Sequence, residues 1–194
     1  MGVLRVAAVA VALAALLIAC SGAEWRTKDI SGMMPELDFE LTDENGEAVT
    51  EADYAGKVNI LFFGYTFCPD ICPVVLARLM RILNELDPAE REQVQVLFVS
   101  VDPRRDSPER LREYTSAFGE DFIGLTGTQE QLKALNKRYR VTYGYGEPDE
   151  RGNYIVSHSG AVFIFDKDGT AQLLVRDSDP NEDVLADLRQ LLDA

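Results

Sequence analysis

The segment VNILFFGYTFCPDICPVVLARLM, residues 58–80, decides the fold that this chain is expected to adopt. Its first part, Val58–Gly64, is almost entirely apolar, which is typical of a strand covered on both faces of a sheet. Apolar residues then recur at helical spacing from Val75 to Leu86, and this periodicity predicts a helix. The segment therefore predicts a buried strand that leads through a short loop into a helix.

Two cysteines, Cys68 and Cys72, lie between this strand and this helix. Pro73 suits the first turn of a helix, where its missing N–H costs nothing, so Cys72 is expected at the helix start and Cys68 in the loop. The helix dipole and the free N–H groups there favour negative charge and are expected to lower the thiol pKa. A structural disulfide, a redox couple and a metal clamp are all compatible with this spacing. A bridge across so small a loop would constrain the unfolded chain little, which disfavours a purely structural disulfide.

The rest of the chain alternates strand and helix patterns. A hairpin that turns at Asn45-Gly46 comes first, and a second hairpin that turns at Asp168-Gly169 comes late. Between them, helices are predicted after a capping Asp106 or Ser107 and after Thr128. Strands that alternate with helices imply a mainly parallel central sheet with right-handed crossovers. The predicted fold class is α/β, with a thioredoxin-like central sheet flanked by helices and an N-terminal β-hairpin elaboration.

Size and charge limit the possible functions. The 194 residues, of which 46% are hydrophobic, are enough for one well-buried domain. The formal net charge of −14 argues against a nucleic-acid partner, because such sites need clustered positive charge to offset phosphate. The acidity instead predicts a soluble, well-hydrated surface.

The first twenty residues have the pattern of an export signal. One early cation, Arg5, precedes an uncharged apolar run, Val6–Ala19. This run is too short to span a bilayer but is typical of the core of a signal peptide. It ends in Leu17-Ile18-Ala19-Cys20, which resembles the lipobox of bacterial lipoproteins, where the cysteine is lipidated and becomes the mature N-terminus.

These patterns divide the chain into three parts. We predict a lipoprotein-type signal peptide at residues 1–19, a polar tether at residues 20–36 that begins with a lipidated Cys20, and a folded domain at residues 37–194. The domain is then exported and anchored to a membrane, facing the periplasm or another extracytoplasmic space. Thiols in such a compartment tend to oxidise unless something keeps them reduced.

The single histidine, His158, offers a third ligand for a metal. It follows a predicted loop, residues 143–153, and lies at the start of a strand predicted to join the central sheet. The alternative is a hydrogen-bonded, inert histidine at a strand end. Two thiolates and one imidazole would form a three-ligand site that suits copper. Zinc normally takes four protein ligands, or three and a water, so the ligand set favours copper over zinc only modestly.

Three stretches, GYTFCPDICP (64–73), VSVDPRRDSPERLREY (99–114) and YIVSHSG (154–160), together resemble the Sco (SenC) family of copper-binding proteins. The resemblance runs from about Leu37 to the C-terminal helix. Members of this family have a thioredoxin-like fold and take part in assembling the dinuclear copper centre of cytochrome c oxidase. The resemblance implies that this chain binds one copper ion, Cu(I) or Cu(II), through Cys68, Cys72 and His158.

The resemblance also implies a role and partners. The expected role is that of a metallochaperone, which binds copper and transfers it by ligand exchange rather than turning over a substrate. The implied partners are the copper-accepting subunit of cytochrome c oxidase and other periplasmic copper or thiol carriers. The alternative is a thiol–disulfide oxidoreductase that uses Cys68 and Cys72 as a redox pair to reduce the cysteines of the copper-accepting partner. A peroxidase-like domain on the same fold ranks third.

Further residues near the motifs carry weaker expectations. Ser157 precedes the histidine at a position where the Sco family often has aspartate, so this chain offers no carboxylate at that position. Asp70 is expected to accept a loop N–H, to tune the metal site or to serve only as a turn residue. Asp102 is expected either to approach the same edge of the sheet or to cap a turn. Tyr65 and Tyr154 are expected to be packing residues.

Overall fold

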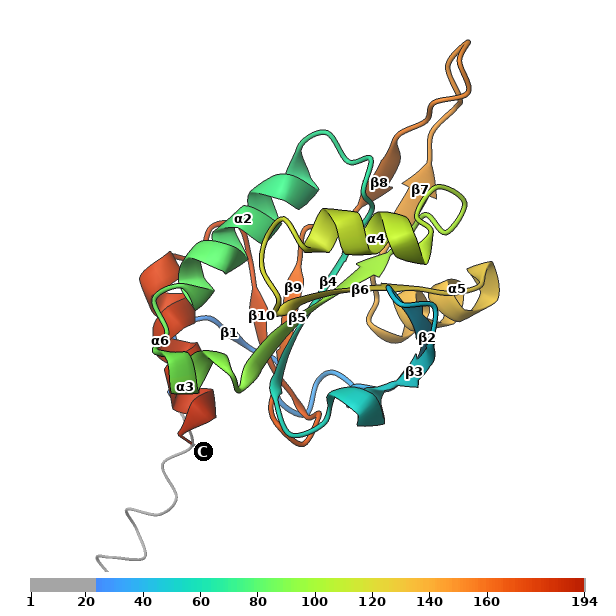
Figure 1. Cartoon of the computed structure of the whole chain (residues 1–194). Coiled ribbons are helices and arrows are strands. Elements are labelled where there is room, and N and C mark those ends of the chain that lie inside the picture. The colour runs from blue at the N-terminus through green and yellow to red at the C-terminus, as the bar shows by residue number, and fades with distance from the viewer. Residues whose placement is uncertain (1–23, 194) are drawn as a thin grey trace, which may run out of the picture.

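The structure of the protein is a computed structural model, and it describes residues 24–193. Helices cover both faces of one eight-stranded sheet, which confirms the predicted α/β class (Figure 1). The predicted signal peptide and Cys20 lie outside the described residues.

The large sheet has the strand order β1-β10-β9-β4-β5-β6-β2-β3. Strands β4, β5 and β6 pair in parallel, and the other neighbouring strands of this sheet pair antiparallel. The parallel centre and the N-terminal hairpin β2–β3 confirm the predicted topology. The strands of the sheet are β1 (Lys28–Asp29), β2 (Glu40–Asp43), β3 (Ala48–Thr50), β4 (Val58–Gly64), β5 (Val94–Ser100), β6 (Phe122–Thr126), β9 (Val162–Phe165) and β10 (Ala171–Val175).

The helices begin close to the predicted positions. The side chain of Ser107 accepts a hydrogen bond from the N–H of Arg110 at the start of α4, and Thr128 accepts one from Gln131 at the start of α5. These two caps satisfy N–H groups that have no partner within the helix. The helical elements are η1 (Glu51–Tyr54), α2 (Ile71–Leu83), α3 (Pro88–Arg91), α4 (Pro108–Thr115), α5 (Gln129–Arg138) and α6 (Asn181–Leu192).

Strand β4 supplies side chains to two separate hydrophobic cores, because successive residues of a strand point to opposite faces. On one face, Ile60 and Phe62 pack in a core with apolar residues of α2, α4 and α6. On the other face, Leu61 and Phe63 pack with α5 and with the N-terminal segment of the domain. Every residue of β4 is buried. The end of β4, where the cysteine loop begins, is therefore held from both sides.

The folded domain begins before the predicted boundary at Leu37. Lys28–Asp29 form β1, which pairs with β10 at the edge of the sheet. The buried carboxylate of Asp187 on α6 accepts hydrogen bonds from the backbone N–H of Arg26 at 3.0 Å and of Thr27 at 2.8 Å. It also accepts one from the Thr27 hydroxyl at 2.7 Å. The second half of the predicted tether is therefore part of the packed domain.

The strand that carries the histidine does not join the central sheet, and that part of the sequence prediction is wrong. Strand β8 (Val156–His158) pairs antiparallel with β7 (Tyr143–Tyr145) in a separate two-stranded sheet. This β7–β8 hairpin projects beyond the rest of the domain (Figure 1). The central sheet resumes only at Val162, beyond Gly160, and glycine within a strand pattern weakens the strand. The predicted loop, residues 143–153, likewise contains β7.

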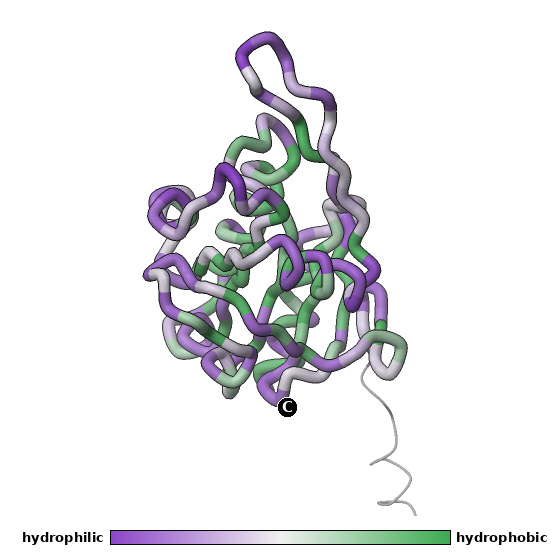
Figure 2. The backbone as a smooth tube through the Cα atoms, turned by 90° about the vertical axis from the view of Figure 1, so that its right-hand side faces the viewer, coloured by the Kyte–Doolittle hydropathy of each residue, from purple (hydrophilic) through white to green (hydrophobic). Residues whose placement is uncertain are grey.

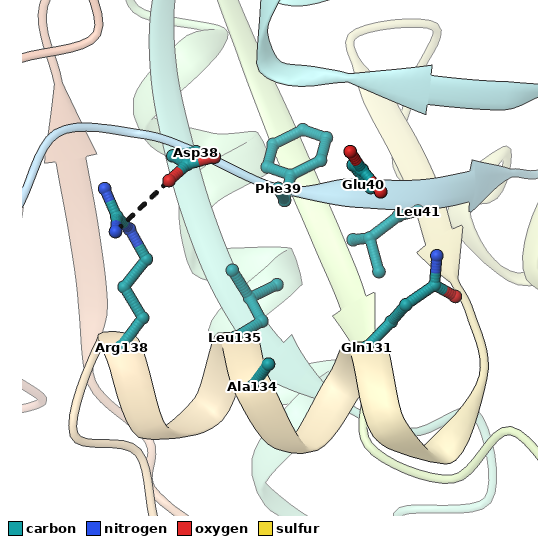
Figure 3. Close-up of a pocket in the computed structure, with 8 residues that line it drawn as sticks. All are labelled: Asp38, Phe39, Glu40, Leu41, Gln131, Ala134, Leu135 and Arg138. Atoms are coloured by element: carbon teal, nitrogen blue, oxygen red, sulfur yellow. Dashed lines mark ion pairs between the residues drawn. The ribbon is translucent and has the colours of Figure 1, made fainter.

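A groove of about 350 Å³ lies between the segment that leads into β2 and the helix α5 (Figure 3). Asp38 and Arg138 form an ion pair of 3.2 Å across it, and Leu135 points from the helix toward the strand (Figure 3). Its lining contains neither a cysteine nor a histidine. We therefore assign this groove to the packing of α5 against the N-terminal hairpin.

We expect Asp187→Ala to lower the free energy of unfolding by about 2–3 kcal/mol, because it leaves three hydrogen-bond donors without their charged acceptor. Asp183→Ala is the matched control on the same helix, since it removes only a solvent-exposed ion pair with Arg26. The control should change the free energy by less than about 1 kcal/mol. Urea denaturation measures both variants, and equal effects would contradict the anchoring role of Asp187.

Candidate metal centre

The two cysteines lie at the connection between β4 and α2, as predicted. Strand β4 ends at Gly64 and α2 begins at Ile71, so Cys68 lies in the connecting loop and Cys72 in the first turn of the helix. A Cβ atom on Gly64 would lie 2.6 Å from the Sγ of Cys72. Only glycine therefore allows the helix start to pack this closely against the strand.

The two thiols differ in exposure. Cys72 is fully buried, whereas Cys68 is partly exposed and accepts a hydrogen bond from the Cys72 backbone N–H at 3.4 Å. Burial raises the pKa of the Cys72 thiol well above its ordinary value. The expectation that the helix start lowers this pKa is therefore wrong for Cys72, because the loss of solvation outweighs the helix dipole. At neutral pH Cys72 is a neutral thiol.

His158 approaches the cysteines from the β7–β8 hairpin. Its Nε2 lies 3.3 Å from the Sγ of Cys72, and its Nδ1 lies 3.0 Å from the carbonyl oxygen of Ser159. Because a carbonyl can only accept, Nδ1 carries the ring proton and Nε2 presents its lone pair to the cysteine. Burial lowers the pKa of His158 below its ordinary value, so the ring is neutral at pH 7. A neutral imidazole held by its other nitrogen is the form that binds metals.

The structure brings all three predicted side chains together. The Sγ atoms of Cys68 and Cys72 and a ring nitrogen of His158 all lie within 4.8 Å of one another. Two sulfurs bound to one ion at about 2.3 Å, the length of a zinc–thiolate bond, can lie up to about 4.6 Å apart. The cluster therefore needs only a small contraction to hold one ion, and its two sulfurs and one nitrogen suit copper or zinc.

Two aromatic rings fix the imidazole. The rings of Tyr65 and Phe62 meet the ring of His158 edge to face, with centroid distances of 5.7 and 6.1 Å. The Tyr65 hydroxyl also accepts a hydrogen bond from the backbone N–H of Val156 at 3.2 Å. Tyr65 was predicted to be a packing residue, and it additionally ties β8 to the end of β4.

Arg105 joins the cysteine loop to the histidine hairpin. Its guanidinium lies 3.7 Å above the ring of Tyr154 and 5.1 Å from that of Phe67. Its Nη1 donates to the Tyr154 carbonyl at 2.9 Å. The buried Asp102 forms an ion pair with Arg105 and accepts a hydrogen bond from the Tyr154 hydroxyl at 2.8 Å. Of the two interpretations of Asp102, its approach to this edge of the sheet is confirmed. Sequence reasoning did not find Arg105.

Asp106 fixes the start of the cysteine loop. Its buried carboxylate accepts hydrogen bonds from the N–H and the hydroxyl of Thr66, at 3.0 and 2.7 Å, and from the hydroxyl of Ser100 at 2.6 Å. Burial raises the pKa of this carboxyl group. Ser107 provides the helix cap instead, and no local pattern predicts this role for Asp106 because Thr66 lies 40 residues away.

The remaining two polar candidates, Asp70 and Ser157, form no hydrogen bond with the three predicted ligand residues in the described part of the chain. Asp70 is exposed at the cap position of α2, and its side chain caps no N–H group of the helix. Ser157 is exposed, and its hydroxyl donates to the carbonyl of Gly144 at 3.2 Å across the hairpin. The carbonyl of Ser159, rather than a carboxylate, is the group that holds the histidine ring.

The model of the SCO1/SenC family matches residues 31–193, which include the cysteine loop, the Arg105 network and the histidine hairpin. The chain belongs to the SCO1/SenC family. The match confirms the resemblance on which the sequence analysis relied.

Relatives of this SCO1/SenC chain include mitochondrial and bacterial proteins. It is 44% identical over 133 residues to the mitochondrial protein SCO2 of Saccharomyces cerevisiae, covering 68% of this chain and 44% of the yeast protein. It is 39% identical over 143 residues to a putative copper-binding protein of Stutzerimonas stutzeri, covering 74% and 69%. The chain thus spans less than half the length of the yeast relative.

The fold also matches a solved Sco structure. The copper-bound structure of ScoI from Bradyrhizobium japonicum superposes with a TM-score of 0.73 at 33% identity, covering 80% of this chain and 98% of ScoI. The predicted thioredoxin-like arrangement is confirmed by this likeness. Within residues 24–193, no helix has the length and apolar character needed to cross a membrane.

We expect iodoacetamide to alkylate Cys68 at least about ten times faster than Cys72 at pH 8 in the reduced, metal-free protein. Cys68 is partly exposed whereas Cys72 is fully buried, and the raised pKa of Cys72 lowers its thiolate fraction, which then grows as the pH rises. Mass spectrometry of Cys68→Ser and Cys72→Ser measures each thiol separately. A Cys72 that reacts as fast as Cys68 would contradict the burial of this thiol.

Proposed function

We propose that this chain binds one copper ion through Cys68, Cys72 and His158 and passes it to a partner protein by ligand exchange. The observation that carries the proposal is the meeting of two sulfurs and one imidazole nitrogen within 4.8 Å. Thiolate sulfur selects soft Cu(I), and imidazole also suits Cu(II). The copper in the related ScoI structure and the putative copper-binding protein of S. stutzeri support copper as the metal.

Binding and release depend on the unequal exposure of the ligands. Copper must displace the protons of both thiols, whereas Nε2 of His158 is already free of a proton. The fully buried Cys72 holds the ion from the protein side, and the partly exposed Cys68 is the sulfur that an incoming partner displaces first. Three protein ligands leave the metal open to attack by a fourth. Because the raised pKa of Cys72 makes protons compete with copper, the apparent affinity rises with pH.

We infer the recipient and the location from family and sequence. The resemblance to Sco proteins supports the copper-accepting subunit of cytochrome c oxidase as the recipient, with other copper or thiol carriers as additional partners. The lipobox-like residues 17–20 support removal of residues 1–19 and a lipid on Cys20 that anchors the domain at the outer side of a membrane. These residues lie outside the described part of the chain.

A second candidate function uses the same sulfurs. Cys68 and Cys72 are free thiols whose sulfurs lie within 4.8 Å, and Cys68 is accessible. A Cys68 thiolate would attack a partner disulfide and release one partner thiol, and Cys72 would then attack the mixed disulfide. The partner gains two electrons as two thiols, and this chain ends with a Cys68–Cys72 disulfide. This reaction prepares a partner to accept copper but does not use His158.

The variant His158→Ala separates the two functions. We expect it to weaken copper binding by at least about 100-fold, because it removes one of three ligands. Mutating a residue that only hydrogen-bonds to a metal ligand already costs about 10–100-fold in metal affinity. Reduction of a small disulfide by Cys68 and Cys72 should stay within about twofold of the parent, since neither thiol is changed. Competition with a Cu(I) chelator measures the affinity, and Ser157→Ala is the matched control. A His158→Ala protein that binds copper as tightly as the parent would show that the three-ligand site is wrong.

A further inference from the structure

Exposed apolar side chains gather around the proposed metal ligands. Six large apolar residues are exposed in the described part of the chain, and five of them lie in the cysteine loop, at the start of α2 or in the β7–β8 hairpin. These five are Phe67, Ile71, Val74, Tyr145 and Ile155; the sixth is Met33. Contiguous exposed apolar surface marks interaction sites, whereas a single exposed residue such as Met33 needs no explanation.

A groove of about 530 Å³ lies between the cysteine loop and the hairpin. Phe67 and Pro69 line it from the loop, Tyr154 and Ile155 from the hairpin, and Arg105 also contributes to its wall. We call it the loop–hairpin groove. Its volume lies within the range of ligand pockets, about 300–1,000 Å³, and can take a large side chain. Cys68, which is partly exposed, lies in the chain between Phe67 and Pro69, so an occupant of the groove lies close to one of the proposed ligands.

The hairpin side of the groove is acidic. Glu147 and Asp149 line it, and Glu150 and Arg151 follow in the turn, which leaves a net negative charge there. The tip of the hairpin is mostly hydrophilic (Figure 2). The carboxylate of Asp149 is held by hydrogen bonds from the side chain and backbone of Asn153, which lower its pKa and keep it ionised. A ligand with positive charge is therefore favoured at this rim.

The wall of the groove also holds an unpaired donor. The Nη2 of Arg105 is buried and has no hydrogen-bond partner within the described residues, although the Nε and Nη1 atoms of the same guanidinium are paired. Buried donors without a partner are rare in native proteins because leaving them unpaired is costly. Because Nη2 is buried, the guanidinium is a packed part of the groove wall rather than a contact offered to an occupant.

We infer that the loop–hairpin groove docks the partner that exchanges copper with this chain, through a segment that presents one large apolar side chain flanked by lysine or arginine. The inference rests on the proposed function and names the chemistry of its partner. The apolar side chain fits between Phe67 and Ile155, and its basic neighbours meet Glu147 and Asp149. Docking there places the partner's own ligands next to Cys68, the ligand that leaves first.

Short synthetic peptides test the groove without any metal. The probe carries a central leucine between lysines; one control peptide replaces the lysines by glutamates, and the other replaces the leucine by serine. We expect the probe to shift the backbone amide signals of Phe67, Cys68 and the non-proline residues of 146–155 in the reduced, metal-free protein. It should also bind at least about tenfold more tightly than either control. Equal binding of the three peptides, or shifts confined to other surfaces, would overturn the inference.

Two matched variants locate the contact. Ile155→Ser should weaken binding of the leucine–lysine peptide about tenfold, whereas Met33→Ser, at another exposed apolar residue away from the groove, should leave it unchanged. Unchanged binding in Ile155→Ser, or an equal loss in both variants, would overturn the proposed groove. Ile155 is not a proposed ligand, so Ile155→Ser should keep the copper affinity of the parent. If the parent protein fails to bind copper, the proposed function is wrong. The two failures are distinguishable, because the peptide assay uses no copper.

Discussion

The site depends on one close contact, the 3.3 Å approach of the Cys72 sulfur to Nε2 of His158. These residues are 86 positions apart, and no local sequence preference brings them together. Two cores fix β4 and with it the start of α2, and Tyr65, Arg105 and Asp102 tie the histidine hairpin to that end of the strand. The metal site is thus a product of tertiary packing, in which side chains fixed beforehand bind a ligand at lower entropic cost.

The same packing gives the three proposed ligand groups different environments. Burial keeps the Cys72 thiol and the His158 imidazole neutral, which avoids the cost of isolated buried charges in the metal-free protein. Cys68 is partly exposed and lies in the chain between Phe67 and Pro69, which line the groove beside the acidic hairpin. A fully buried thiol beside a partly exposed one is an arrangement suited to the proposed transfer, since retention by buried ligands alone would oppose release.

Sequence alone was sufficient for features that local patterns or motifs encode. The apolar run of β4 predicted the strand, and the proline after Cys72 predicted the start of the helix that follows the cysteine loop. The caps at Ser107 and Thr128 predicted two further helices, and the family resemblance indicated His158 as a ligand. Burial depth and long-range partners have no such local pattern. For that reason the raised pKa of Cys72, the separation of β8 from the central sheet and the contacts of Arg105 and Asp106 were missed or predicted wrongly.

X-ray absorption at the copper edge tests the central claim most directly, because it reports which atoms surround the ion. The reduced protein loaded with one equivalent of copper should show two sulfur neighbours at about 2.3 Å, the usual metal–thiolate distance, and one imidazole nitrogen. The nitrogen contribution should disappear when His158 is replaced by alanine while both sulfurs stay. A copper ion surrounded by sulfur alone, or by nitrogen and oxygen without sulfur, would contradict the account.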